Sequence, residues 1–234
     1  MRVVFIVPCY NMSENFEVLV ESITSQKSED WSCIMIDDIS DDDTWGKISN
    51  LQNSDGRFTG VKNLEKKYAL RNIVENSRSF QDRDDIIIAT IDGDDSLCND
   101  ETVGLLIEQY KKGSDVVWTG HRWDINNMNI SREMPKDVDP YSYPWCSSHL
   151  RTFRCSLLKG IDDVNFKDTV GNWFKRGYDQ ALMLPILSLT SNRYYIPEIC
   201  YKYNINSVSI KDRSWEESGQ ISTINIVRSR GFIK

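Results

Sequence analysis

The sequence predicts an α/β fold in which an open, mainly parallel sheet is flanked by helices. Three observations predict it. Short β-rich runs alternate with segments whose apolar residues recur at helical spacing. The run Ile86–Ile91 is apolar throughout most of its length, as strands buried on both faces of a parallel sheet are. Polar clusters follow several of these runs, at the strand ends where open parallel sheets bind ligands.

The first half of the chain carries the alternation. The expected strands are Val3–Val7, Trp31–Ile36, Phe58–Val61, Ile86–Ile91 and Val116–Thr119. Between them, apolar residues at helical spacing predict helices over Phe16–Ile23, Trp45–Leu51, Leu70–Ser77 and Val103–Tyr110. Repeated strand–helix units favour parallel strands joined by helical crossovers.

The second half is less regular. Residues 120–148 are polar and aromatic and contain three prolines, which predicts a loop or a small antiparallel excursion. The later elements expected are a helix over Phe153–Lys159, a helix from near Asp179 into Leu182–Leu189, strands Tyr194–Ile196 and Ile199–Tyr203, and a helix from Trp215 onward. Pro185 fits the first turns of its helix or kinks it. Neither a linker nor a repeat divides the chain, so we expect a single domain over residues 1–234.

Composition narrows the function classes. With 40% hydrophobic and 27% charged residues the chain is typical of globular proteins. A net charge of −7 argues against an extended basic surface for nucleic acid, although it leaves room for a local basic groove. The six cysteines lack Cys-x-x-Cys spacing, which favours reduced core thiols. Because no apolar run is long enough to span a membrane, we expect a soluble, cytoplasmic protein without a transmembrane segment.

An acidic cluster follows the most strongly predicted strand. Asp92, Asp94 and Asp95 lie within four residues, and crowding like charges costs energy unless a cation or solvent balances them. Oxygen ligands favour a hard divalent ion such as Mg²⁺ or Mn²⁺. An EF-hand is excluded, because its sixth and twelfth positions would be Leu97 and Val103. The alternative is that Asp94 or Asp95 only forms a turn or caps the next helix.

A second cluster, Asp37–Asp43, follows the strand Trp31–Ile36. A carboxylate at a strand end can accept hydrogen bonds from the imide of a pyrimidine or from ribose hydroxyls, and we favour this for Asp38. For Asp41–Asp43, an acidic loop at the start of a helix explains the charges equally well. The first strand is followed by Pro8-Cys9-Tyr10-Asn11, which is neither a Walker loop nor a dinucleotide glycine fingerprint.

Taken together, these segments resemble the N-terminal signature of family 2 glycosyltransferases. The matching segments are Pro8–Asn11, Asp37–Asp42, Ala69–Asn72 and Asp92–Asp95, in the same order and spacing over roughly residues 3–118. The resemblance implies a GT-A fold, Rossmann-like, with a nucleotide-sugar-binding half at 1–118 and a small acceptor-side region in 119–234. His149–Arg154 and Gly177–Gln180 also resemble family segments, except that Tyr178 replaces a glutamate.

The resemblance also implies roles for single residues. Pro8, Tyr10 and Asp38 would line the nucleobase pocket, with Tyr10 against the base; Asn11 belongs to the same donor-binding segment, and Arg71 would face the base or phosphate. Asp94 would ligate the metal. Asp92 would contact the ribose or join the metal site, and Asp95 would contact the sugar or support the site. His149 would contact donor or acceptor. Asp179 would be the catalytic base, its alternative being a helix cap.

The predicted function is therefore metal-dependent, inverting transfer of a sugar from a nucleotide-sugar donor, with UDP-sugars favoured. A glycan, a protein, a lipid-linked sugar or a modified nucleobase would suit as acceptor. One alternative enzyme is an aspartyl-phosphate phosphatase, because Asp92–Ser96 reads Asp-x-Asp-x-Ser after a strand; in that class, however, the motif follows the first strand. A nucleotide-sugar or glycan-binding module without turnover is the non-enzymatic alternative.

Overall fold

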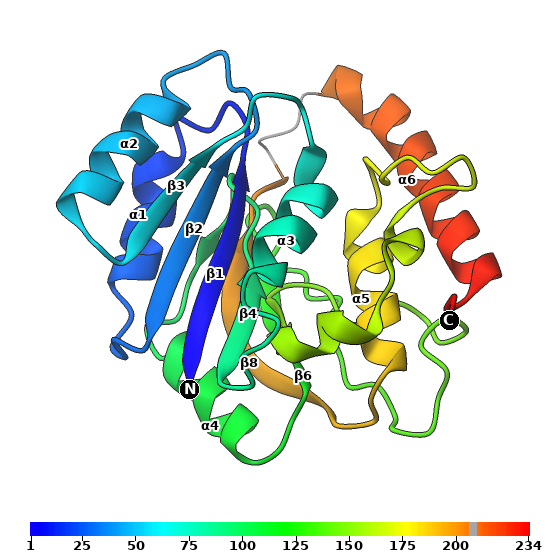
Figure 1. Cartoon of the computed structure of the whole chain (residues 1–234). Helices are drawn as coiled ribbons and strands as arrows, with labels where there is room; N and C mark the ends of the chain where they lie inside the picture. Colours follow the sequence, from blue (N-terminus) through cyan, green and yellow to red (C-terminus); the bar gives the residue numbers. More distant parts are fainter. Residues whose placement is uncertain (206–209) are drawn as a thin grey trace.

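A computed structural model describes residues 1–205 and 210–234, and in these residues an eight-stranded sheet lies between layers of helices (Figure 1). Its strands are β1 (Arg2–Cys9), β2 (Trp31–Asp37), β3 (Phe58–Lys62), β4 (Ile86–Thr90), β5 (Ser96–Leu97), β6 (Val116–Trp123), β7 (Arg151–Arg154) and β8 (Arg193–Tyr203). Their order across the sheet is β3-β2-β1-β4-β7-β6-β8-β5. Strands from both predicted halves of the chain therefore share one sheet.

The first four strands form the parallel part of the sheet. β1 lies at its centre and pairs in parallel with β2 and β4, and β2 pairs in parallel with β3. Alternate β1 residues enter different cores, with Val3, Phe5 and Val7 on one face and Val4 and Ile6 on the other. Burial on both faces explains why the sequence here is apolar without alternation. This part of the prediction is confirmed.

Helices cover both faces of the sheet, as expected (Figure 1). They are α1 (Phe16–Thr24), α2 (Thr44–Ser54), α3 (Tyr68–Arg78), α4 (Thr102–Lys111), α5 (Tyr178–Ser188) and α6 (Ile210–Arg230), with short 3₁₀ helices η1 (Cys155–Gly160) and η2 (Asp163–Phe166). Residues of α1, α2 and α4 pack into one core. Residues of α3, α5 and α6 pack into the other. Pro185 lies inside α5, as the sequence allowed.

The helix expected over Phe153–Lys159 is wrong at its start. Phe153 belongs to β7, which is inserted between β4 and β6 and is antiparallel to both. Only the 3₁₀ helix η1 follows it. Local periodicity favoured a helix, but pairing with two neighbouring strands satisfies the backbone of these residues and buries Phe153 fully.

The two strands expected around Pro197 form one strand, β8. The strand pairs in parallel with β6, and its register shifts on either side of Gly120, whose partner is Ile199, so that Pro197 lies between paired positions. A side chain on Gly120 would lie 2.7 Å from the carbonyl oxygen of Pro197. The irregularity therefore accommodates the proline, because the strands can approach closely only where a residue without Cβ faces it.

Residues 124–150 contain neither helix nor strand, in agreement with the expected loop, although β6 continues to Trp123 before the loop begins. The final helix, α6, begins at Ile210 and packs against α5 (Figure 1). Among the described residues, every helix is too short or too polar to cross a lipid bilayer.

Candidate active site

Two adjoining cavities of about 400 and 800 Å³ lie where β1, β2 and β4 end. Both are lined by Pro8, Tyr10, Asp92, Tyr178 and Tyr203, so they form one continuous cleft. The carboxyl ends of the parallel strands point at this cleft, in the position where open α/β sheets bind ligands. Residues of β1, the turn after β4, α5 and β8 therefore meet there although they are distant in sequence.

The acidic turn Asp92–Asp95 follows β4 and forms one wall of the cleft. The amide of Asp95 donates to the carbonyl of Asp92 at 3.0 Å, which closes the turn. A Cβ on Gly93 would lie 2.8 Å from Met12 Sδ and 2.9 Å from the carbonyl oxygen of Pro8. Glycine is therefore required for the turn to pack against the end of β1.

Asp92 is held by partners from distant elements. Its carboxylate accepts a hydrogen bond from the hydroxyl of Tyr178, and Arg151 Nη2 lies 3.5 Å from the same oxygen. Its amide donates to the hydroxyl of Tyr201 at 3.0 Å. The position of this carboxylate is therefore fixed by β7, β8 and α5 together.

Asp95 is the buried member of the turn. Its carboxylate accepts from the hydroxyl of Tyr201 at 2.7 Å and from the amide of Asn204 at 2.7 Å. Burial, followed by the charges of Asp92 and Asp94, raises the pKa of Asp95 well above its usual value. A cation bound nearby would offset this crowding. Asp94 is half-buried and lines the larger cavity.

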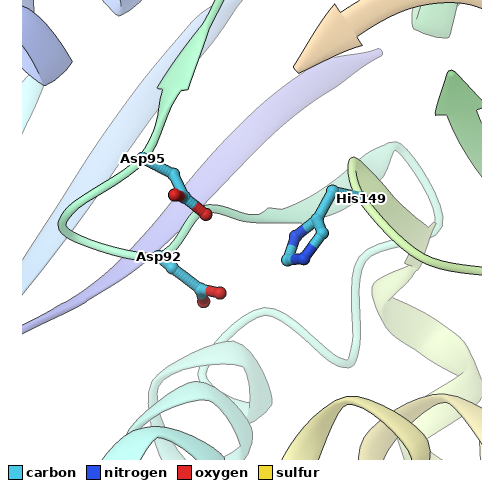
Figure 2. Close-up of side chains that lie close together, drawn as sticks. All are labelled: Asp92, Asp95 and His149. Carbon is cyan, nitrogen blue, oxygen red and sulfur yellow. The ribbon is translucent and has the colours of Figure 1, made fainter. Parts of the chain in front are cut away.

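His149 approaches the acidic turn from the other side of the cleft (Figure 2). Its ring stacks on Tyr201 and Tyr203, with centroid distances of 4.6 and 5.0 Å. It is buried, and its Nδ1 has no hydrogen-bond partner. Burial, with the charge of Arg151, lowers its pKa well below the usual value, so the ring is neutral at pH 7.

Figure 2 shows the side chains of Asp92, Asp95 and His149 close to one another. One ligand atom from each lies within 4.8 Å of those of the other two. Two carboxylates and a neutral imidazole whose Nδ1 has no hydrogen-bond partner fit a divalent cation, because each offers a lone pair and the acids supply balancing charge. The sequence predicted Asp92 and Asp94 as ligands and missed that His149 reaches this group.

Arg151 supplies a positive charge behind the acidic turn. Its side chain is almost fully buried, with Nε donating to Thr90 at 3.2 Å and Nη2 to the Tyr178 hydroxyl at 3.1 Å. Burial alone would lower its pKa. The neighbouring Tyr178 and Asp92 outweigh that cost and raise the pKa, so the guanidinium keeps its charge. A buried cation of this kind requires the nearby carboxylates as counter-ions.

Asp179 lies in the first turn of α5 and lines the smaller cavity. Gly177 precedes the helix with φ of 60°, a left-handed conformation that glycine adopts without strain. Burial raises the pKa of Asp179, against the opposing charge of Arg151. The carboxyl is thus more basic than an exposed aspartate.

Tyr10 and Asp38, both predicted to line a nucleobase pocket, lie at the smaller cavity, and their side chains differ in exposure. Tyr10 is 52% exposed. The carboxylate of Asp38 is buried and accepts hydrogen bonds from the amides of Lys67 and Tyr68, both at 2.8 Å. It therefore holds the start of α3.

Two predicted donor-binding residues have other partners. Arg71 forms ion pairs with Glu65 and Glu75 at 2.9 and 2.7 Å and does not line either cavity of the described cleft. Asn11 lines the larger cavity, and its side chain accepts from the amide of Asp41 at 2.8 Å. Asp42, in the same loop, accepts from the amide of Thr44 at the start of α2, which is the alternative considered for these acids.

Several cleft residues were not chosen from the sequence. They are Lys66, Arg151, Lys175, Arg176, Tyr178 and Tyr203. Arg151 is buried, and the other three cations give an acidic protein a local basic surface suited to a phosphate group. Arg151 and Tyr178 belong to the segments His149–Arg154 and Gly177–Gln180, which resemble family segments. That resemblance was the one signal in the sequence that could have identified them as cleft residues. Lys66 and Lys175 follow no pattern.

Comparison with known proteins adds the family to this geometry. Residues 4–176 match the profile described as "Glycosyl transferase family 2". The chain belongs to glycosyltransferase family 2. Its members are sugar-transferring enzymes, so the family match decides against the phosphatase alternative. No curated protein matches the chain in a search by sequence.

Solved structures of glycosyltransferases share the fold of this family member. TarS 1–349 of S. aureus in complex with UDP has a TM-score of 0.67 and 18% identity, over 95% of this chain and 65% of that one. The mannosyltransferase PcManGT from Pyrobaculum calidifontis, in complex with GDP-Man and Mn²⁺, has a TM-score of 0.63 and 16% identity, over 95% and 63%. This chain spans 37% of a longer TarS structure. The expected GT-A fold is confirmed.

Proposed function

We propose that this glycosyltransferase takes a sugar from a nucleoside-diphosphate sugar and transfers it with inversion to an acceptor hydroxyl, using Mn²⁺ or Mg²⁺. The observation that carries the proposal is the single cleft in which Asp179, the Asp92–Asp95 turn and the exposed ring of Tyr10 meet. A nucleotide-sugar needs these features in one place, because its base, diphosphate and anomeric carbon are joined.

The proposed cation site is the acidic turn. The sequence predicted Asp92 and Asp94 as ligands, and the structure groups Asp92 with Asp95 and His149. Asp92 is common to both sets and is therefore the first proposed ligand. Asp94, which faces the larger cavity, is the proposed second ligand. His149 and Asp95 complete the alternative set. When bound, the cation supplies Lewis-acid stabilisation of the negative charge that develops on the leaving diphosphate.

Asp179 is the proposed base. Its carboxylate accepts the proton of the acceptor hydroxyl while that oxygen bonds to the anomeric carbon. The bond between the anomeric carbon and the diphosphate oxygen breaks, and the nucleoside diphosphate leaves with the electron pair. A raised pKa favours this role, because a base near the working pH removes a proton more effectively. One carboxylate suffices when inversion occurs in one displacement.

The basic residues of the cleft have a separate role in this proposal. Arg176 lines both cavities, and Lys175 lines the smaller one. Their charges would attract the diphosphate without needing the cation. UDP-sugars are the favoured donors, in agreement with the UDP and UDP-GlcNAc bound in the TarS structures; the GDP-Man of PcManGT extends the comparison to a second base.

Donor hydrolysis tests the proposal without knowledge of the acceptor. The protein is incubated with UDP-, GDP-, CDP- and ADP-sugars and Mn²⁺, and release of the nucleoside diphosphate is measured. We expect release from at least one donor, loss with EDTA, and restoration by Mn²⁺. Glu101→Gln, at the exposed residue that precedes α4 and pairs with Lys27, is the control and should match the parent. Binding of a donor without release, even with simple sugar acceptors, would favour the non-catalytic module instead.

A further inference from the structure

Near Tyr10, where the nucleobase of the donor is proposed to bind, the cleft holds a hydrogen-bond donor and an acceptor side by side. Lys66 Nζ donates to the main-chain carbonyl oxygen of Asp38 at 2.9 Å. The same ammonium lies 2.8 Å from the centroid of the Tyr10 ring. All three residues line the smaller cavity. A nucleobase that stacks on this face of Tyr10 must therefore displace the Lys66 ammonium. The hydrogen-bonding edge of that nucleobase would then lie next to both the ammonium and the Asp38 carbonyl.

The carboxylate of Asp38 is already engaged elsewhere. One of its oxygens accepts from Asn63 Nδ2 at 2.7 Å and the amide of Lys67, and the other accepts from the amide of Tyr68. The side chain is only 4% exposed. What Asp38 offers the cavity is thus its main-chain carbonyl, which changes partner when Lys66 moves.

Arg71, the cation expected near the base, is held outside the cleft by two glutamates. Lys66 is a more suitable donor. Its side chain is 30% exposed, and its ion-pair distance to the Asp38 carboxylate is 3.8 Å, longer than a good hydrogen bond. To bind a ligand, the ammonium would exchange its hydrogen bond to the Asp38 carbonyl for one to the nucleobase.

We propose that Lys66 and the Asp38 carbonyl together select a nucleobase whose edge carries a carbonyl beside an imide N–H. This inference rests on the proposed function. Uracil and guanine share that edge: their exocyclic oxygen would accept from Lys66, and the adjacent N–H would donate to Asp38. Cytosine and adenine present the reverse order, with an amino group beside a bare ring nitrogen. In each of these two bases, the amino group would face the Lys66 ammonium, donor against donor. The ring nitrogen would face the Asp38 carbonyl, acceptor against acceptor.

Matched pairs of nucleotides test this selection. Binding of UDP, CDP, GDP and ADP with Mn²⁺ is measured by calorimetry for the parent, Lys66→Met and Lys66→Arg. We expect the parent to bind UDP at least about tenfold more tightly than CDP, the factor that corresponds to one hydrogen bond of 1.4 kcal/mol. If purine nucleotides bind, the affinity for GDP should be higher than the affinity for ADP. Lys66→Met keeps the aliphatic stem but should bring the UDP-to-CDP ratio close to one, and Lys66→Arg should retain most of the ratio.

Lys62→Met is the matched control. Lys62 lies 5.3 Å from the ring centroid of Trp45, outside the cleft, so the change removes a comparable lysine–aromatic contact and should leave the ratio unchanged. Equal loss of UDP and CDP affinity in Lys66→Met would assign Lys66 to the phosphates and overturn the inference. A parent that binds UDP and CDP equally would also overturn it, while leaving the proposed function intact. A parent that binds none of the four would refute both.

Discussion

The hydroxyl of Tyr178 donates a hydrogen bond to the carboxylate of Asp92 and so joins the first turn of α5 to the turn after β4. Arg151 donates to the same hydroxyl, at 3.1 Å. Tyr178 stands where the family resemblance has a glutamate. A tyrosine here orients Asp92 without adding a second negative charge, and Asp179 is the next residue of the chain. The contact therefore couples the proposed cation site to the proposed base.

Tyr178→Phe tests this coupling. The ring is kept, but one oxygen of Asp92 loses its donor and Arg151 loses an acceptor. We expect turnover of the donor to fall roughly 10- to 100-fold, since hydrogen bonds to charged groups contribute about 1.5–3 kcal/mol. Affinity for the nucleotide without metal should change little. Tyr194→Phe, on the exposed surface of β8, should behave as the parent. Unchanged turnover in Tyr178→Phe would mean that the contact is only structural.

Replacing Asp94 and Asp95 separately identifies the cation ligands. Asp94→Asn should abolish the Mn²⁺ dependence of UDP binding while the fold remains intact. Asp95→Asn should keep the Mn²⁺ dependence, because the Asp95 carboxylate already accepts hydrogen bonds from Tyr201 and Asn204. Calorimetry with Mn²⁺ or EDTA and thermal unfolding give the two readouts. If Asp94→Asn binds like the parent while His149→Ala loses the Mn²⁺ dependence, Asp92, Asp95 and His149 are the ligands.

Asp179→Asn separates a base from a helix cap. A base should lose about 10²–10⁴-fold in turnover with nucleotide affinity nearly unchanged. Asparagine caps helices as well as aspartate does, so a mere cap should leave turnover intact. Retention of the donor's anomeric configuration in the product would also contradict the assignment, because it requires a second displacement.

The raised pKa of Asp179 means that its ionised carboxylate, which the proposed reaction needs, lowers the stability of the fold. Its pKa is higher in the folded than in the unfolded chain, so its stabilising contribution is present below the unfolded pKa and is lost as pH rises through the folded value. At pH 7, Asp179→Asn should therefore have a free energy of unfolding equal to or above that of the parent. In the parent, turnover should fall in acid from a pH above the usual aspartate range. Urea unfolding and a pH–rate profile measure these effects.

Asp38 should behave in the opposite way. Burial would raise its pKa, but hydrogen bonds from Lys67 and Asn63, among others, outweigh this and hold the pKa below its usual value. Its contribution is present above the unfolded pKa of about 3.9 and is lost as pH falls through the folded value. Asp38→Ala should lower the free energy of unfolding at pH 7 by about 1–3 kcal/mol, the cost of leaving buried donors unpaired.

The difference in free energy of unfolding between Asp38→Ala and the parent should become smaller at acidic pH. Urea unfolding at pH 7 and pH 3 measures it. If the carboxylate itself bound the nucleobase, as the sequence analysis favoured, the same variant would lose about 1–3 kcal/mol of nucleotide affinity. A large loss of UDP affinity with an unchanged free energy of unfolding would support direct base recognition by the carboxylate instead of the carbonyl.

The parallel part of the fold could be read from the sequence because its signals are local. Val3–Val7 and Ile86–Ile91 are apolar enough to identify strands buried on both faces, and the acids Asp92–Asp95 directly follow the second of these strands. β7 could not be read in this way. Its place between β4 and β6 depends on pairing with residues far along the chain, which no local window contains.

The sequence by itself determined the family, the sheet class and the acidic turn at Asp92–Asp95, since each depends on residues close together in the chain. Only the tertiary structure decided how the side chains are used. Asp38 faces α3, Arg71 faces two glutamates, and Lys66 takes the place beside Tyr10. The physical reason is that a hydrogen-bond partner is fixed by distance in space. A carboxylate in a motif therefore shows where charge is available, and the packing of distant elements determines what it binds.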